Sequence, residues 1–402
     1  MKVGYLASLY PALSHTFIQR EILELEKLGV DVVRFSVRRA LPKDQLGDVA
    51  CLEATKTRSL LPLGPDVLVA MLWLVLTRPL LGVKTFRLAL RSARGLHSIV
   101  KWCAYFVEAI LLAYWLQKDG VKHLHCHFGN AGSNTAWLAA KLALADLSIT
   151  FHGIDLDEPE LFRHREKLAD AIFAICISNF GRQLLLQSID TENAPKVVVV
   201  RCGFPVPPAH IVPPPPKRGE IICVARLSEE KGHHVLLEAL SLLIASDVNF
   251  HCTLVGSGPL EGDLTEAISR LGLAQHVTMS GGVPNDKVVA MIAASDLSVL
   301  ASYGEGIPIA LLESLAWERP YVATRVGGIP ELTPKDKSGL LVEPGNAQEL
   351  ADGLKRLIED TELSSKLAKS GRAIVTEFYD PGSAATSMLE LFRKANRMHS
   401  TD

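Results

Sequence analysis

Cysteine is scarce and scattered in this chain of 402 residues. The seven cysteines are odd in number, and no two of them are spaced as Cys-x-x-Cys. A disulfide framework or a zinc site built on cysteine pairs is therefore not expected, and a reducing compartment is favoured.

A marked excess of charge is also missing. The formal net charge is -2 and the isoelectric point is about 6.7, so nucleic acid is not expected as a partner. Hydrophobic residues make up 48% and charged residues 21%, the balance of a globular enzyme with an ample core. A chain of 402 residues fits two or three domains.

Two apolar stretches that could suggest a secretion signal or a membrane span are short. The N-terminal "MKVGYLASLYPALS" breaks at Tyr10-Pro11 and is too short for a signal peptide, so it predicts the first strand of a cytoplasmic protein. The apolar stretch "DVLVAMLWLVLTRPLLG" falls far short of the ~20 residues that a bilayer span needs.

What the sequence does contain is a repeated order of apolar run, turn and helical pattern. Such alternation predicts parallel sheets covered by helices on both faces. The expected strands lie at 2–8, 31–37, 123–129, 148–153, 171–178, 196–203, 220–226, 250–256, 277–281, 297–302, 320–326 and 339–344. Helices are expected near 17–28, 132–145 and 383–397, and from about 233, 260, 286 and 308.

A proline-rich tract, "PVPPAHIVPPPPKRG", lies near the midpoint and favours an extended connector. It separates an N-terminal domain, 1–204, from a C-terminal domain, 220–377, with 205–219 as the linker. Residues 378–402 are expected to cross back onto the first domain. The fold class is α/β, with two doubly wound, Rossmann-like domains facing a central cleft, where ligands bind beyond the carboxyl ends of the strands.

Between Val67 and Val107 there is no acidic residue, and basic residues recur at helical spacing. They would lie on one helical face beside a strongly apolar segment, which is typical of a surface that touches anionic lipid. The residues are Lys84, Arg87, Arg91, Arg94 and Lys101. The alternative is a solvated charged face on a buried helical hairpin.

Two carboxylates stand out in "SYGEGIPIALLESLAWERP". Glu313 lies in an otherwise apolar helix, where a buried charge is costly unless donors or a cation meet it. Glu305 precedes Gly306, and the amides of Gly306 and Ile307 would lie at a helix N-terminus that suits an anion or a polar ligand. Pro308 would then be the first helical residue. The alternative is a helix cap with one internal salt bridge.

Two cations follow an expected strand in "VARLSEEKGHHVLLEAL". Lys231 stands at the start of a helix, the wrong end of the dipole for a cation unless an anion lies between them. Arg226 and Lys231 could therefore clamp a diphosphate. The alternative is two exposed bases balanced by Glu229 and Glu230.

These segments resemble a known family. In order, "ICVARLSEEKGHHVLLEAL", "LVGSGPL", "VPNDKVVAMIAASDLSVLAS", "EGIPIALLESLAWERPYVATRVGGIPEL" and "GLLVEPGNAQELADGL" resemble the C-terminal domain of family 4 retaining glycosyltransferases with the GT-B fold. The N-terminal "SLYPALSHTFIQREILELEKLG", "HLHCHFG", "FHGID" and "ISNFGRQLL" are similar to its exopolysaccharide and colanic-acid-type branch.

The resemblance implies a role for each matching residue. Glu305 would contact hydroxyls of the donor sugar near the reacting carbon, and Glu313 the ribose hydroxyls of the nucleotide. Arg226 and Lys231 match the pair that stabilises the leaving diphosphate. Val283 matches the segment that flanks the base.

Further implied contacts come from both domains. The amides of Gly306 and Ile307 would meet sugar or phosphate, and His152 would reach the sugar from the N-terminal domain. On the acceptor side the branch usually has Ser-Glu-Thr-Phe, whereas this chain has "SHTF", with Ser14 followed by His15 in place of the acid. This departure puts the acceptor in doubt more than the chemistry.

Three other patterns are not expected to be cofactor sites. His123, His125 and His127 share a strand face, but no carboxylate or cysteine stands at ligand spacing, so no metal is predicted. Only His127, at the strand end, is placed near the cleft, on the acceptor side. Asp155 and Asp157 are interpreted as loop carboxylates. "GSGPLEG" lacks the third glycine of a dinucleotide fingerprint and predicts a tight turn.

The expected function is transfer of a sugar from a nucleotide diphosphate sugar to a saccharide or polyprenyl-linked acceptor, with retention and without a metal, in cell-surface polysaccharide synthesis. The expected location is cytoplasmic, peripheral on the inner face of the membrane. Two alternatives stay open: a GT-B epimerase or hydrolase of nucleotide sugars, and a non-catalytic sugar-nucleotide-binding scaffold of a polysaccharide assembly complex.

Overall fold

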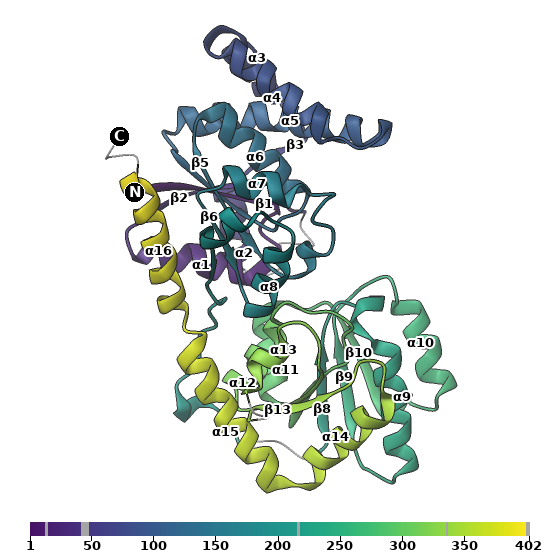
Figure 1. The fold of residues 1–402 in the computed structure, drawn as a ribbon. Coiled ribbons are helices and arrows are strands. Elements are labelled where there is room, and N and C mark those ends of the chain that lie inside the picture. Colours follow the sequence, from purple (N-terminus) through teal and green to yellow (C-terminus); the bar gives the residue numbers. More distant parts are fainter. Residues whose placement is uncertain (13–14, 42–47, 215–217, 335–336, 399–402) are drawn as a thin grey trace. The chain divides into compact units, whose positions relative to one another are not determined.

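A computed structural model describes the chain except for residues 13–14, 42–47, 215–217, 335–336 and 399–402. The chain folds into two compact units. Unit 1 comprises Met1–Cys202 with Pro381–Asp402, and unit 2 comprises Gly203–Asp380. Each unit is built around its own parallel sheet (Figure 1).

The sheet of unit 1 has the strand order β3-β2-β1-β4-β5-β6-β7 in the described residues, and all neighbouring strands are parallel. The strands are β1 (Lys2–Leu9), β2 (Asp31–Arg38), β3 (Arg58–Leu61), β4 (His123–His127), β5 (Asp146–Phe151), β6 (Phe173–Cys176) and β7 (Val197–Val199). The strand order reverses at β1, which lies between β2 and β4. The loops after these central strands therefore meet at one edge of the sheet.

Helices cover both faces of this sheet. They are α1 (Thr16–Lys27), α2 (Asp48–Lys56), α3 (Asp66–Thr77), α4 (Pro79–Ser92), α5 (Leu96–Lys118), α6 (Ala131–Ala143), α7 (His164–Asp170), α8 (Asn179–Gln187) and α16 (Pro381–Met398). On one face α5 and α6 enclose the larger apolar core, and α3 and α4 pack outside them. On the other face α1 and α16 lie side by side (Figure 1).

Unit 2 has the strand order β10-β9-β8-β11-β12-β13 over its described residues, again with parallel neighbours. The strands are β8 (Glu220–Val224), β9 (His251–Val255), β10 (Val277–Gly281), β11 (Leu297–Leu300), β12 (Tyr321–Thr324) and β13 (Gly339–Val342). The helices are α9 (His233–Ala245), α10 (Glu261–Arg270), α11 (Asn285–Ala293), α12 (Ile309–Ala316), α13 (Ile329–Leu332), α14 (Ala347–Glu359) and α15 (Thr361–Phe378). Here the order reverses at β8, between β9 and β11.

The strands are short and apolar because helices cover both faces of each sheet. Every residue of β6, β11 and β12 is buried, so these strands show no alternation of apolar and polar side chains. The two doubly wound sheets expected from the sequence are confirmed. The sequence missed β3, which has four residues, is followed by Pro62 and lies at the edge of its sheet.

One structural expectation was wrong. The five basic residues between positions 84 and 101 do not share a helical face, because α4 ends at Ser92 and α5 begins at Leu96. Lys84, Arg87 and Arg91 lie on α4, Arg94 lies in the connection, and Lys101 lies on α5.

The last helix carries part of the core of unit 1, and this can be tested. Phe392 on α16 is 1% exposed, and its ring centroid lies 5.0 Å from that of His123 and 5.7 Å from that of Phe173. We expect Phe392→Ala to lower the free energy of unfolding of unit 1 by about 3–5 kcal/mol, because it leaves a cavity at a buried aromatic site.

Urea unfolding followed by tryptophan fluorescence measures this, since four of the five tryptophans lie in unit 1. The matched control on α16 is Glu390→Ala, whose side chain is exposed and whose effect should stay within about 0.5 kcal/mol. Equal midpoints for Phe392→Ala and the wild type would contradict the assigned role of α16.

Candidate active site

The site residues of unit 2 lie on loops that leave the carboxyl ends of neighbouring strands. Arg226 and Lys231 follow β8, and Glu305 follows β11, the strand that pairs with β8. Glu313 lies on α12, directly after the same loop. The strand order reverses between these strands, so the sheet brings both loops together at the point where α/β sheets bind ligands.

One ion pair joins the two loops. Nζ of Lys231 lies 2.6 Å from Oε1 of Glu305, and the hydroxyl of Ser302 donates to the same oxygen at 2.6 Å. The side chains of Lys231 and Glu305 are only 20% and 9% exposed. A carboxylate so little hydrated needs donors, and these two provide them.

Glycine permits the close approach of the loops. Gly232 has φ +62°, and a Cβ there would lie 2.0 Å from the carbonyl oxygen of Ala301. Gly327, after β12, has φ +55°, and a Cβ there would lie 1.8 Å from the carbonyl oxygen of Glu305. Any other residue would push the loop away at either position, so both glycines are required by the backbone of the site.

Arg226 forms a second ion pair, which is more exposed to solvent than the pair of Lys231 and Glu305. Its Nη2 lies 2.5 Å from Oε1 of Glu230, which also accepts a hydrogen bond from the Ser228 hydroxyl at 2.7 Å. Burial acts to raise the pKa of Glu230, but the hydrogen bonds from Arg226 and Ser228 outweigh it and lower the pKa to about 2. The Arg226 side chain is 62% exposed, so it can exchange this partner for another anion at small cost.

Glu313 is buried, as the sequence predicted. It is 3% exposed, and its Oε1 accepts a hydrogen bond from Nδ2 of Asn285 at 3.1 Å. Asn285 begins α11, and nearby Val283 packs against the apolar cluster that contains Val288. The residues expected to meet the ribose and the base therefore come from adjacent elements of unit 2.

The turn before α12 differs in detail from the expectation. Pro308 caps the helix, and Ile309 is the first helical residue. The preceding Gly306 and Ile307 are buried, and the carbonyl of Gly306 accepts a hydrogen bond from the Gly328 amide at 2.9 Å. The loop after β12 therefore supports the loop that carries Glu305.

His15 and His127, expected on the acceptor side, and His152, expected to reach the sugar, lie in unit 1 at the carboxyl ends of β1, β4 and β5. Nδ1 of His127 lies 3.0 Å from Nε2 of His152, and the Phe128 ring packs on His152 with centroids 4.4 Å apart. His15 donates from Nδ1 to the carbonyl of Leu9 at 2.9 Å, which fixes the protonated ring nitrogen. Ser14 lies outside the described residues.

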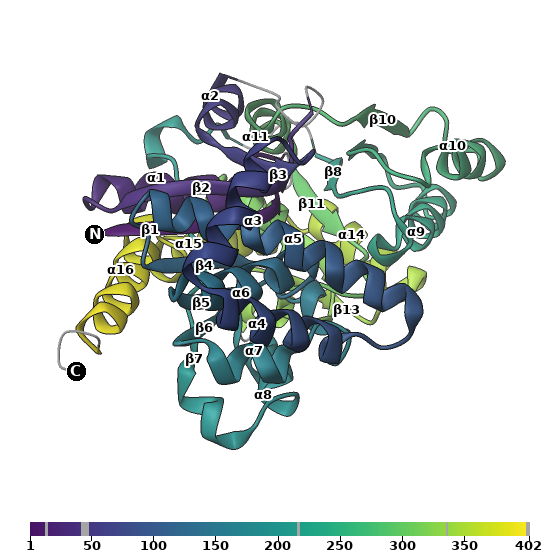
Figure 2. The same ribbon diagram turned by 90° about the horizontal axis from the view of Figure 1, so that it is seen from above.

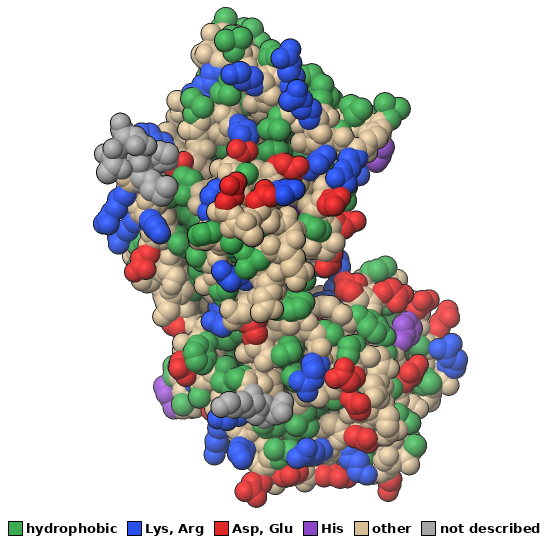
Figure 3. All heavy atoms as spheres, in the orientation of Figure 1, with side chains coloured by type: hydrophobic (Ala, Val, Ile, Leu, Met, Phe, Trp, Pro, Cys, Tyr) green, Lys and Arg blue, Asp and Glu red, His purple; other side chains and the backbone are tan. Residues whose placement is uncertain are grey.

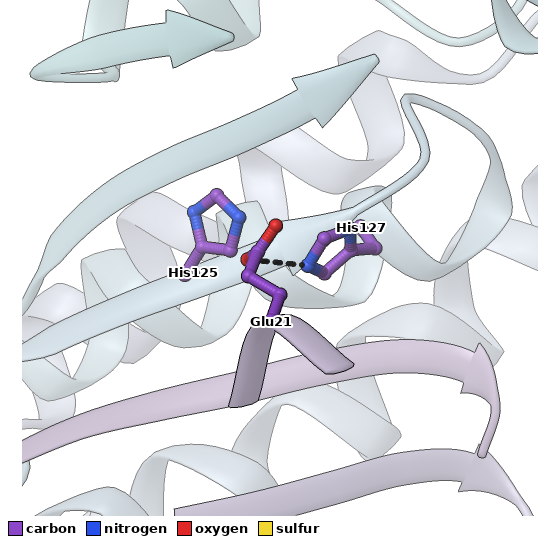
Figure 4. Close-up of side chains that lie close together, drawn as sticks. All are labelled: Glu21, His125 and His127. Carbon is purple, nitrogen blue, oxygen red and sulfur yellow. Dashed lines mark ion pairs between the residues drawn. The ribbon is translucent and has the colours of Figure 1, made fainter. Parts of the chain in front are cut away.

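A carboxylate does lie beside the histidines of β4, contrary to the expectation. Oε1 of Glu21, on α1, lies 3.2 Å from Nε2 of His127, although the two are not aligned as a hydrogen bond (Figure 4). The same oxygen accepts a hydrogen bond from Tyr5 at 2.8 Å. This contact could not be predicted from the sequence, because Glu21 is more than a hundred residues from His127 in the chain. The two side chains approach each other only when α1 packs on the sheet.

The ligand atoms of Glu21, His125 and His127 lie within 4.8 Å of one another, which raises the question of a metal (Figure 4). His125 argues against one, because its two ring nitrogens contact the hydroxyls of Ser148 at 2.8 Å and Thr150 at 3.0 Å. A metal would need one of these nitrogens to leave its partner. We therefore assign no metal to this cluster, and metal-free chemistry stays a prediction.

Of the two loop carboxylates Asp155 and Asp157, the first has a structural role. Asp155 is buried and accepts hydrogen bonds from the backbone N–H of Gly129 at 2.5 Å and of His152 at 2.8 Å. It thereby holds the loops after β4 and β5 together. Asp157 is exposed in the same loop.

Several residues of the site were not identified from the sequence. Ser302, Asn285 and Glu21 each contact a residue that was. Glu230 was named only as one of two carboxylates that could balance Arg226 and Lys231, and it pairs with Arg226. Ser302 had the clearest signal, since it stands three positions before Glu305 directly after a strand. Asn285 and Glu21 had none, because each reaches its partner only across the packed fold.

Comparisons with known proteins agree on one family. Residues 210–374 match the family described as glycosyl transferases group 1. The chain is 31% identical to WcaL of Escherichia coli K12, a glycosyltransferase assigned to colanic acid biosynthesis, over 92% of this chain and 94% of that protein. It is 29% identical to AmsK of Erwinia amylovora, an amylovoran biosynthesis glycosyltransferase, over 94% of this chain and 96% of that protein.

A solved structure shows the same fold. HepE of Anabaena, determined in complex with UDP, superimposes with a TM-score of 0.71 at 20% identity and covers 98% of this chain and 100% of its own. The two parallel α/β units are therefore those of a GT-B protein.

The buried histidines of unit 1 predict a pH dependence of stability. Burial lowers the pKa of His125 and His152 well below 6.5, and it lowers the pKa of His164 to about 3. Below pH 6.5 the unfolded chain takes up protons that the folded chain does not, so stability is complete above that pH and falls as the pH falls. Burial also raises the pKa of Asp155, which acts in the opposite direction at low pH.

The test therefore compares how steeply the unfolding free energy falls with pH, rather than the unfolding free energy at one pH. We expect His125→Gln to flatten the fall in unfolding free energy between pH 7 and pH 5.5 by up to about 1.4 kcal/mol per pH unit, whatever its effect at pH 7. Urea unfolding at several pH values measures this. Identical slopes for the variant and the wild type would show that folding does not lower the pKa of His125.

Proposed function

Because the chain belongs to the group 1 glycosyltransferase family, we propose that it transfers a sugar from a nucleotide diphosphate sugar to a saccharide or polyprenyl-linked saccharide, with retention and without a metal ion. The relatives named for colanic acid and amylovoran biosynthesis support a place in cell-surface polysaccharide synthesis. HepE, solved with UDP, supports a nucleotide as part of the donor. The proposed location is the cytoplasmic face of the membrane, where a lipid-linked acceptor would be reached.

The observation that carries this proposal is the convergence of Lys231 and Glu305 from two strand ends. A diphosphate entering beside them would meet Lys231 and Arg226, whose present partners are side-chain carboxylates. Negative charge grows on the leaving diphosphate as the bond to the sugar breaks. Both cations then interact most strongly in the transition state, which is the condition for lowering the barrier.

The carboxylates and amides of the loop would hold the rest of the donor. Glu305, released in part from Lys231, would accept hydrogen bonds from sugar hydroxyls. Glu313, already paired with Asn285, would accept from the ribose, and Val283 would flank the base. The amides of Gly306 and Ile307 would bind sugar or phosphate oxygens, as amides that precede a helix do.

For retention we propose attack of the acceptor on the same face of the sugar that the diphosphate leaves. The bond from the anomeric carbon to the diphosphate oxygen breaks, the bond to the acceptor oxygen forms, and the acceptor proton passes to the departing phosphate. Arg226 and Lys231 supply the positive charge that a metal ion would otherwise supply. His152 would contact the sugar, and Ser14, His15 and His127 would lie toward the acceptor.

Removal of Lys231 tests the diphosphate contact. We expect Lys231→Met to lower kcat/KM by about 10²–10³-fold, the usual cost of removing one preorganised charge from a transition state. It also leaves Glu305 without its cation, so the melting temperature should fall. Thermal unfolding and steady-state kinetics with a nucleotide sugar and its acceptor measure the two effects.

A double variant separates stability from catalysis. Lys231→Met with Glu305→Gln removes both charges and should recover stability but not activity. Lys366→Met, at an exposed lysine on α15, is the matched control and should change neither. Wild-type activity in Lys231→Met would contradict the proposed site.

The stereochemistry is a separate test. We expect the product to keep the anomeric configuration of the donor, as read by NMR of the transferred sugar, and we expect EDTA to leave the rate unchanged. An inverted product would contradict the proposed mechanism, and loss of activity in EDTA that a divalent ion restores would contradict metal-free transfer. Rapid turnover of the nucleotide sugar without any acceptor would favour a hydrolase or epimerase instead.

A further inference from the structure

The outer helices of unit 1 expose an unusual amount of apolar surface. Of the 25 large hydrophobic side chains exposed in the described residues, 12 fall between positions 68 and 100. The most exposed are Leu68, Val75, Leu76, Leu80, Leu96 and Val100, between 64% and 81%. We call α3, α4 and the first two turns of α5 the outer helices; in Figure 3 their surface, at the top of the view, is mainly hydrophobic and basic.

α3 shows the pattern most clearly. Its buried residues, Ala70 and Leu74, face the rest of unit 1. Its exposed face carries Leu68, Leu72 and Leu76, which recur every four residues and so form one stripe. When the outer face of a surface helix meets only water, that face carries charged side chains, whereas the exposed face of α3 carries leucines. The apolar face is therefore built for a medium other than water.

Positive charge lies on α4 and α5, the two helices that contact α3. Lys84, Arg87 and Arg91 on α4 are exposed, as is Lys101 on α5, and no acidic residue occurs between Val67 and Val107. Arg94 differs from the others, because it lies 2.7 Å from Glu160 and is thereby neutralised. The outer helices thus combine exposed apolar side chains with four cations that form no ion pair with any carboxylate in the described part of the chain. This combination matches an anionic bilayer surface in both hydrophobicity and charge.

The helices are arranged to lie in the surface rather than to cross it. α3 and α4 have 12 and 14 residues, so neither helix alone reaches the ~20 residues of a span. The two helices meet at 114°, so together they do not form one straight span (Figure 2). α5 has 23 residues and is apolar enough to span, but half of its apolar window is buried inside the protein. Its second half packs on α6 in the core of unit 1.

We propose that the outer helices insert the apolar side chains of α3 and the start of α4 into the interface of an anionic bilayer, while Lys84, Arg87 and Arg91 bind its headgroups. This deepens the proposed function, since it rests on an enzyme that works on a lipid-linked acceptor. A basic surface alone would bind lipid only electrostatically. The exposed leucines make the contact hydrophobic as well.

Vesicle co-sedimentation tests the proposal, with phosphatidylcholine vesicles and vesicles that also contain phosphatidylglycerol. We expect the wild type to bind the anionic vesicles and to bind less as salt is added. Leu72→Gln, Leu76→Gln and Leu80→Gln together should weaken binding to both vesicle types by about 10-fold or more, because they remove buried apolar area. Lys84→Gln, Arg87→Gln and Arg91→Gln together should remove the preference for anionic vesicles.

The matched control is Leu28→Gln, Val49→Gln and Leu52→Gln, at three exposed aliphatic residues of unit 1 outside the outer helices. It should bind vesicles as the wild type does. Equal binding by the wild type and the outer-helix leucine variant would overturn the proposal. So would a wild type that ignores vesicles and forms a dimer in sedimentation velocity that the same variant dissociates, since a second copy would then cover this face.

A soluble saccharide acceptor keeps this test apart from that of the proposed function. All three variants should transfer sugar to it at the wild-type rate, because none of the changed residues lies in the site. Vesicle binding without transfer to any acceptor would contradict the proposed function and leave the bilayer contact standing. Transfer without vesicle binding would overturn the contact alone.

Discussion

The ion pair between Lys231 and Glu305 is the contact on which the candidate site depends. It joins the loop after β8 to the loop after β11, and the Ser302 hydroxyl shares the same carboxylate oxygen. The pair forms only because Gly232 and Gly327 let backbones approach to distances that a Cβ would forbid. With Arg226 held by Glu230, both cations of the site are balanced before a ligand arrives. A diphosphate would then exchange partners with existing charges, and the protein avoids the cost of two unpaired cations.

The polar side chains near the strand ends of unit 1 differ in kind from those of unit 2. Burial lowers the pKa of His125 and His152 and so keeps these two rings neutral, with Glu21 and Asp155 as the nearby carboxylates. Neutral rings can be buried together, whereas several charged groups could not. The hydrogen bond between His127 and His152 links two adjacent strand ends and so fixes the ring of His152. Orientation, rather than charge, is what this edge provides.

The outer helices carry many apolar side chains that face outward. Phe392 on α16, by contrast, packs its apolar side chain against the sheet of unit 1. On α3 the leucines of the exposed stripe contribute little to folding because they remain in contact with water. Their burial becomes favourable only on association, so the same side chains that reduce solubility would provide the energy of attachment.

Much of the architecture follows from the sequence alone. Continuous apolar runs separated by helical patterns predicted every strand except β3, because a strand buried on both faces has no polar alternation. Glu305, Glu313, Arg226 and Lys231 could be selected because charges at strand ends and inside an apolar helix are costly without a reason. Their partnership, however, depends on β11 pairing with β8, which no local pattern reveals.

What the tertiary structure decided concerns contacts between segments far apart in the chain. It brought Glu21 to His127 and Asn285 to Glu313, and it showed which side chains of α16, expected to return to the first domain, pack on the sheet of unit 1. It also showed that the basic residues from Lys84 to Lys101 belong to two helices and a connection, since helical spacing in a sequence does not reveal where a helix ends. Local periodicity determines which face of an element is apolar. Only packing determines what that face meets, because the partner comes from elsewhere in the chain or from outside it.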